Sequence, residues 1–176
     1  MKVFSTLFQS RDLQLRIKKI RNPYWLAGFT EGEGCFLIRI QNSSVYKLGS
    51  QIKLVFTLIQ HSRDAALVKS FVEYFGCGNY YKRLNGLSCA FIVTKLDDMT
   101  EKVIPLYANY SLLGSKKQDY LDFKRVAELM NDKGSFNPSP HSGSPPHTCV
   151  GWIASLVGGE GLDQIQAIKS GMNRGR

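Results

Sequence analysis

The chain has 176 residues, enough for one compact domain with a tail but short for two domains. Its apolar runs all fall well below the ~20 residues that a membrane-spanning helix needs, so no membrane role is expected. Lys and Arg outnumber Asp and Glu by 23 to 14, and the resulting formal charge of +9 fits either a polyanionic partner or a basic surface kept for solubility. The four cysteines form no C-x-x-C pair, so they indicate neither a zinc site nor a disulfide framework.

The first 21 residues are basic, with Asp12 as their single acid. The positive charge is concentrated between Arg16 and Arg21. Such a segment fits a basic arm, a mitochondrial targeting sequence or the remnant of a linker. We favour the arm, because the charge lies next to the first predicted helix of the domain.

A helix is predicted to start at Asn22-Pro23, where an N-cap residue precedes a proline at the first helical position. This helix should end near Gly32 and Gly34. A strand follows over 35–42, because Phe36, Ile38 and Ile40 alternate with more polar neighbours. A second strand is expected over 51–59 for the same reason.

Further elements continue the pattern. Residues 62–74 predict a helix, and residues 79–84 and 88–94 predict a hairpin around the turn pair Asn85-Gly86. Two more helices are expected over 96–107 and 116–130. The order is therefore αββαββα. It predicts an α+β domain over residues 22–133, with a four-stranded antiparallel sheet, helices on one face and the other face free.

Composition changes after this domain. Residues 134–159 contain no Asp, Glu, Lys or Arg and are rich in Pro, Ser and Gly, which is typical of a loop or a disordered insertion. Residues 160–176 predict a short helix over 161–172 and a basic tail.

The segment LAGFTEGEG, residues 26–34, carries the most chemical information. Gly28 and Gly32 share one helix face, where small residues allow a second backbone to come close. Alternatively they are merely tolerated, at about 1 kcal/mol each. Glu31 and Glu33 lie two apart and cannot share a face. Both stand at the helix C-terminus, where the helix dipole disfavours negative charge, so a cation such as Mg²⁺ would compensate them. An exposed helix-end glutamate without a ligand is also common.

At this point a family becomes recognisable. NPYWLAGFTEGEGCFLI resembles the LAGLIDADG motif of homing endonucleases and the strand that follows it. The resemblance continues in the blocks QIKLVFTLIQH, FGCGNYY, VTKLDD and LLGSKKQDYLDF, and resumes in GLDQIQAIKSGMNRGR. These blocks stand in family order. They are similar to the C-terminal half of two-motif fungal mitochondrial enzymes.

The resemblance implies a paired site. In this family two motif helices pack against each other, and their ends bring two acidic residues to the scissile phosphates. Glu33 takes the catalytic and metal-binding position here, with Gly34 beside it and Mg²⁺ as the implied cofactor, while Glu31 fits a local structural acid. Residues of the motif helix would face the second half: Leu26, Gly28, Phe29 and Gly32. This chain has one motif, so a homodimer or a partner half-protein must complete the site.

The resemblance also assigns roles to two residues outside the motif. Gln60, at the end of the second strand, and Lys116, before a later helix, match polar and basic positions of the family site. Lys117 is an alternative to Lys116. A lysine near the phosphate can stabilise charge in the transition state, or it can simply hold a phosphate in place.

By the same resemblance, the open face of the sheet binds DNA in the major groove. The outward positions are expected to be Leu37, Arg39, Gln41, Gln51, Lys53, Thr57, Asn79, Tyr81, Arg83, Ser88 and Thr94. Arginines can pair with guanine and glutamines with adenine. An ordinary solvated strand face would show the same alternation. Apolar side chains on this face, including Val55, Ala90 and Ile92, would read little beyond thymine methyl groups.

Three functions follow as hypotheses. The first is a site-specific, Mg²⁺-dependent double-strand DNA endonuclease that acts as a dimer. The second is a non-catalytic fold that binds structured RNA, as an intron maturase or as a component of a mitochondrial ribonucleoprotein such as the ribosome. The third is an inactive half that completes another protein. The uncharged insertion and the single motif favour the last two, and the family's organellar introns imply mitochondrial localisation.

Overall fold

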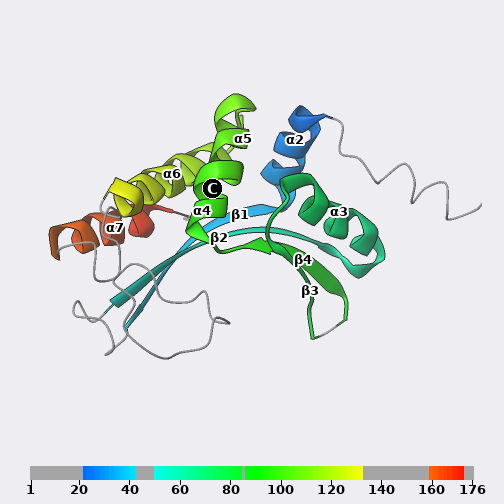
Figure 1. Ribbon diagram of the computed structural model, residues 1–176, viewed down its shortest axis with the longest axis horizontal. Coiled ribbons are helices and arrows are strands. Elements are labelled where there is room, and N and C mark those ends of the chain that lie inside the picture. The colour runs from blue at the N-terminus through cyan, green and yellow to red at the C-terminus, as the bar shows by residue number, and fades with distance from the viewer. Residues whose placement is uncertain (1–21, 43–49, 85, 133–158, 173–176) are drawn as a thin grey trace, which may run out of the picture.

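The computed structural model describes residues 22–42, 50–84, 86–132 and 159–172. The predicted basic arm, the uncharged insertion and the basic tail lie outside the described residues. In the described part, a curved four-stranded sheet forms one layer and the helices form a second layer on one of its faces (Figure 1). The predicted α+β architecture, with helices on one face only, is confirmed.

The motif helix α2 spans Pro23–Glu33. The side chain of Asn22 caps it by accepting a hydrogen bond from the backbone N–H of Tyr24 at 2.9 Å. At its other end, the Gly34 N–H donates to the Thr30 carbonyl, and the chain enters strand β1 (Gly34–Asn42) without an intervening loop. The junction is tight: a Cβ on Gly34 would stand 2.5 Å from the Thr30 carbonyl oxygen. Glycine is therefore required where helix and strand meet.

The sheet has the order β1-β2-β4-β3, and all neighbouring strands are antiparallel. Strand β2 spans Ser50–His61, two residues further than the sequence predicted at its end. The hairpin strands are β3 (Asn79–Lys82) and β4 (Ser88–Val93). Gly86 in their turn has φ 69°, a conformation that L side chains rarely adopt, as expected for a tight hairpin.

Between the two hairpins lie the short 3-10 helix η1 (Ser62–Asp64) and helix α3 (Ala65–Phe75). Helix α3 ends because Gly76 adopts the left-handed conformation, with φ 59°. The expected helix over 62–74 is thus confirmed in place, with a 3-10 first turn.

The helix predicted over 96–107 is present but not uniform. It consists of α4 (Leu96–Asp98), a π-helical turn η2 (Met99–Val103) and α5 (Ile104–Asn109). Pro105 supplies the physical reason. It has no N–H to donate to the carbonyl of residue 101, and its ring crowds that carbonyl, so the preceding turn widens and Ile104 N–H bonds to the Met99 carbonyl instead.

Two further helices complete the layer: α6 (Lys116–Asp132) and α7 (Gly159–Gly171). Helix α6 packs over β1, and α7 packs against α6. Ile165 and Met172 are buried in the same core as the sheet residues. The C-terminal helix therefore belongs to the fold of the domain.

The core fills the space between sheet and helices with aromatic rings. Phe36 and Phe56, on neighbouring strands, have ring centroids 5.1 Å apart, and both pack on Tyr107 of α5. Tyr107 also lies 2.7 Å from the Thr30 hydroxyl. Since Thr30 donates to the Leu26 carbonyl, Tyr107 is the donor in that pair. Burial raises the pKa of Tyr107, so its hydroxyl keeps its proton and α2 stays tied to α5.

No helix in the described ranges is long and apolar enough to cross a bilayer.

Candidate acidic site and nucleic-acid interface

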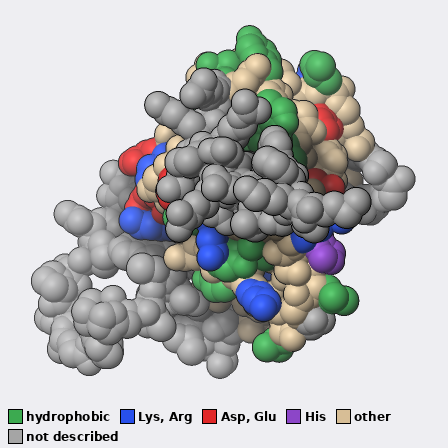
Figure 2. Space-filling view, turned by 90° about the vertical axis from the view of Figure 1, so that its right-hand side faces the viewer, with side chains coloured by type: hydrophobic (Ala, Val, Ile, Leu, Met, Phe, Trp, Pro, Cys, Tyr) green, Lys and Arg blue, Asp and Glu red, His purple; other side chains and the backbone are tan. Residues whose placement is uncertain are grey.

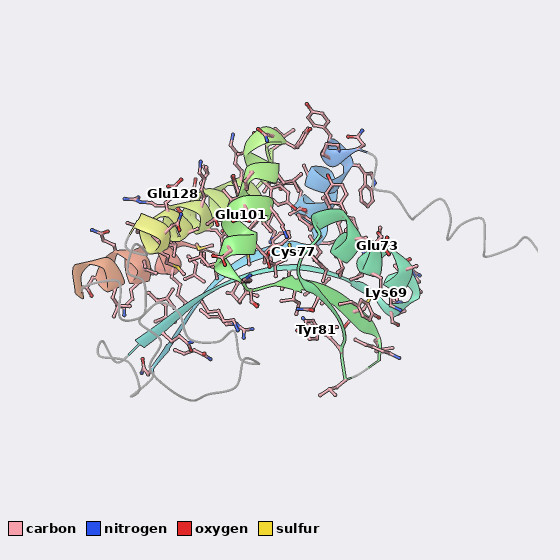
Figure 3. The ribbon with its side chains drawn as sticks, in the orientation of Figure 1. Lys69, Glu73, Cys77, Tyr81, Glu101 and Glu128 are labelled. Carbon is pink, nitrogen blue, oxygen red and sulfur yellow. The ribbon has the colours of Figure 1, made fainter. Side chains whose placement is uncertain are left out.

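The open face of the sheet lies opposite the helical layer. Strand alternation places Phe36, Phe56 and Phe91 in the core and turns their neighbours along each strand outward. Figure 3 shows Tyr81 on the side of the sheet away from the helices, whereas Glu101 and Glu128 lie in the helical layer. The ladder register then defines rows of outward side chains across the face, and these rows show which predicted contacts come together.

Two polar rows occupy the end of the face formed by β1 and β2. Gln41 stands opposite Gln51, and Arg39 stands opposite Lys53. Like charges directly opposite each other repel and destabilise a sheet. Within the described part of the chain, neither Arg39 nor Lys53 has an ion-pair partner. An anion bound over this row would relieve the repulsion.

The middle of the face is apolar. Leu37 pairs with Val55, and the next row runs Cys35, Thr57, Ile92 and Asn79. Val55 and Ala90 are buried although they point away from the core, while Leu37 and Thr57 are half-buried. Leu37 and Thr57 therefore offer some contact surface, but the middle of the face presents few hydrogen-bonding groups.

The far end of the face is polar again. His61 pairs with Ser88, and the Arg83 N–H donates to the Ser88 carbonyl at 3.0 Å, which continues the row beyond β3. Arg83, Tyr81 and His61 are exposed at this end. Thr94 is also exposed, but it lies at the opposite end of β4, just beyond the Phe56–Val93 pair. In Figure 2, which views the molecule from the right-hand side of Figure 1, Lys and Arg side chains lie next to hydrophobic ones at the level of the sheet.

Every nucleic-acid contact expected from the sequence thus lies along this face or at its ends. Sequence reasoning missed three outward positions: Cys35, Ile59 and His61. Cys35 and Ile59 are the first and last residues of the predicted strands over 35–42 and 51–59, and His61 lies two residues beyond the second of these. Extending the alternation of β2 to its true end would have identified Ile59 and His61.

None of the described Asp and Glu residues lies on the open face, whereas the helical layer contains several. There Lys102 pairs with Asp98 at 3.2 Å and Lys124 with Glu128 at 3.7 Å. Lys102 and Lys124 are thus neutralised locally, while Arg39 and Lys53 of the open face, which have no acidic partner among the described residues, remain available to an outside anion.

The three residues expected in catalysis gather at one end of the sheet. Glu33 is exposed at the last position of α2, directly before Gly34, which pairs with Leu58. Gln60 follows two residues later on β2 and therefore lies beside the end of α2. It is half-buried, and its side-chain oxygen accepts from the His61 N–H at 3.0 Å.

Lys116 enters the same region as the first residue of α6. Two residues before it, Gly114 donates its N–H to the Glu31 carboxylate at 2.8 Å, which ties the start of α6 to the last turn of α2. Lys116 is half-buried, whereas Lys117 is exposed. Glu31 is engaged with its own chain, in keeping with the structural role expected for it, and Glu33 is the acid that points to solvent.

The chemistry of Glu33 and Gly34 fits part of a magnesium or calcium site, because a carboxylate and a backbone carbonyl are hard oxygen ligands. Among the described residues, no group of three His, Cys, Asp or Glu side chains could hold a metal ion. Glu33 could therefore supply one ligand of a metal ion, and the remaining ligands would have to come from another chain, from DNA or from water.

The outer face of α2 is exposed beside this acid. Gly28 and Gly32 are open to solvent, and a Cβ at either position would meet no atom within 4 Å. Tyr24 and Trp25 are large hydrophobic residues with 68% and 47% of their surfaces exposed. Phe29 is half-buried between Trp25 and Phe71. Leu26, expected at a partner interface, is fully buried in the core of its own domain and has no surface to offer a partner.

Known proteins are similar to this chain in sequence and in fold. The LAGLIDADG endonuclease family matches residues 26–127, more than half of the chain. A relative named probable intron-encoded endonuclease 2, from Neurospora crassa, is 39% identical over 109 residues, which cover 62% of this chain and 23% of the relative.

Solved structures of DNA-bound meganucleases resemble this chain as well. The meganuclease I-SmaMI bound to uncleaveable DNA superposes with a TM-score of 0.73 at 36% identity, over 90% of this chain and 46% of that chain. I-SmaMI has also been solved with cleaved DNA, and with uncleaved DNA in the presence of calcium ions. I-LtrWI bound to its target DNA gives the same TM-score at 35% identity. This chain spans less than half of each of these proteins. On the family match and these likenesses together, the chain belongs to the LAGLIDADG endonuclease family.

Proposed function

We propose that this chain is one half of a site-specific, divalent-metal-dependent endonuclease that cuts both strands of a long DNA target. The observation that carries the proposal is the position of Glu33. It is an exposed acid at the end of a helix with an open outer face, next to a sheet face whose cations have no acidic partner among the described residues. A second half would bring a second such acid, and the sheet would hold the duplex between them.

Within this site each residue has a distinct task. Glu33 and the Gly34 carbonyl would hold Mg²⁺, which supplies a Lewis acid and lowers the pKa of a bound water. Gln60, at the end of β2, would orient a water molecule or a phosphate oxygen of the DNA by a hydrogen bond. Lys116 stabilises negative charge on the phosphate, while Arg39 and Lys53 position the duplex through its backbone or read guanine.

The test combines cleavage and binding. A plasmid library of randomised target sites, incubated with the protein and Mg²⁺, selects a cleavable sequence. Glu33→Gln should then abolish cleavage but leave affinity for that site nearly unchanged. Glu101→Gln, an exposed acid in the helical layer, is the matched control and should cleave normally. Cleavage by Glu33→Gln at the native rate would contradict the proposal.

A homodimer is the simplest source of the second half. Its mass in solution should be twice the 19.8 kDa of one chain. Gly28→Leu places a bulky side chain on the open face of α2, where nothing stands within 4 Å, so the single chain can still fold. The variant should run as a monomer and lose cleavage. If it remains a dimer, another surface joins the chains.

A second candidate is an RNA-binding fold without catalysis. The apolar middle of the open face favours it, because Val55 and Ala90 offer no hydrogen bonds for reading base edges. A monomer that prefers structured RNA over duplex DNA at matched salt would support this function and displace the first.

The names of the intron-encoded relatives favour a mitochondrial location, which a fluorescent fusion in the source organism would test.

A further inference from the structure

Glu31, the other acid of the motif helix, has no task in the function proposed above. Its Oε1 atom accepts a hydrogen bond from the backbone N–H of Gly114 at 2.8 Å, across 83 positions of sequence. The two groups are in close contact, since a Cβ on Gly114 would stand 2.6 Å from Oε2 of the carboxylate. Only glycine fits here without displacing the carboxylate.

Gly114 makes a second hydrogen bond in the opposite direction. Its carbonyl accepts from the backbone N–H of Lys117 at 3.1 Å, in the first turn of α6. A single residue therefore connects the last turn of α2 to the first turn of α6. Lys116 lies between the two bonded residues.

The rest of this connection is also attached to its surroundings. At its start, the ring of Tyr110 meets Tyr24 of α2 edge-on, with centroids 5.0 Å apart. In its middle, Leu112 is buried with 1% of its surface exposed. The contact with Glu31 holds the end next to the lysine.

We propose that Glu31 is a positioning residue that fixes the first turn of α6, and with it Lys116, relative to Glu33. The two glutamates lie in the same helical turn, so α2 sets the position of the acid directly and the position of the lysine through Gly114. This inference rests on the proposed nuclease function for its catalytic meaning. The geometric claim, that Glu31 places Lys116, stands on the contacts alone.

Two variants of the full-length protein separate these claims. Glu31→Ala removes the acceptor, whereas Glu31→Gln keeps an oxygen that can accept from Gly114. Amide exchange by NMR should become about tenfold faster at Gly114 in Glu31→Ala, because its N–H loses its hydrogen-bond acceptor, and should stay near native in Glu31→Gln, which keeps one. The backbone amide shift of Lys116 should move in the first variant and return in the second. Glu101→Gln should change neither signal.

Cleavage gives the catalytic readout. Glu31→Ala should lower kcat with little change in KM and should shift the pH dependence of the rate, because the lysine is displaced while DNA still binds. Glu31→Gln should restore both. Gly114→Ala, which pushes the carboxylate away from the other side, should repeat the effects of Glu31→Ala and serves in its place if that variant does not fold.

The outcomes are distinct. Unchanged amide exchange at position 114 and unchanged Lys116 shifts in both Glu31→Ala and Gly114→Ala would overturn the positioning role. A protein that cuts no DNA, yet shows the expected exchange and shifts, would overturn the proposed function and leave the positioning of Lys116 intact.

Discussion

The two faces of the sheet are built by the same strands but hold different kinds of side chain. On the covered face, Phe36, Phe56 and Phe91 are fully buried and meet other rings. On the open face, Arg39 and Lys53 stand side by side without acidic partners among the described residues. The covered face is complete within the chain, while the open face carries repulsion that an outside anion would remove. Stability and binding are thus assigned to opposite sides of one layer, and four experiments test that division.

The largest effect is expected from two neighbouring residues on β2. Phe56→Ala removes a buried ring that contacts four other aromatic rings, and should cost about 3–5 kcal/mol of unfolding free energy. Thr57→Ala, the next residue and on the open face, should cost less than about 1 kcal/mol. Urea denaturation measures both. Similar losses at the two positions would mean that the open face also carries the fold.

The second test lies where the helix joins the sheet. Gly34→Ala would press a methyl group against Thr30, whose backbone cannot move away, and should destabilise the protein by about 1–3 kcal/mol. Gly32→Ala meets nothing within 4 Å and should stabilise the isolated chain by up to about 1 kcal/mol through helix propensity. Thermal unfolding of the two variants gives the comparison. A stable Gly34→Ala would show that the junction relaxes.

Removing charge from the open face should affect binding and spare stability. If Arg39 and Lys53 each neutralise a phosphate, replacing both with Gln should reduce the slope of log affinity against log salt by about 0.9 per contact. The unfolding free energy should hold or rise slightly, since two opposed cations are gone. Fluorescence anisotropy over a salt series measures the slope. An unchanged slope would place the DNA elsewhere.

The smallest effect is expected at the buried hydroxyl pair. Tyr107→Phe removes the hydrogen bond to Thr30, while the Thr30 hydroxyl keeps its bond to the Leu26 carbonyl. The expected loss is about 1 kcal/mol, with binding to DNA unchanged. Loss of cleavage without loss of stability would show that this contact aligns the motif helix as well as holding it.

Much of this organisation could be predicted because it repeats with a short period. Alternation in β1 and β2 assigned each residue to a face, and the Asn-Pro and Gly signals bounded α2. The π-helical turn before Pro105 and the burial of Leu26 could not be predicted, because each depends on which neighbours surround the residue once the layers pack. In the site, Glu33 followed from the motif. The bond between Glu31 and Gly114 joins residues 83 positions apart, and no local pattern reports such a contact.

The strand order also has a consequence for how the chain folds. Strands β1 and β2 form one hairpin and β3 and β4 another, so each pair can form by closing a short loop. The ladder between β2 and β4 must bring Phe56 to Val93 across the whole of α3, and it joins the two hairpins at the centre of the sheet. This pairing has the larger entropic cost and should set the folding rate. Substitutions along it, such as Leu58→Ala, should slow refolding, whereas those at the outer edge of β1 should act mainly by hastening unfolding.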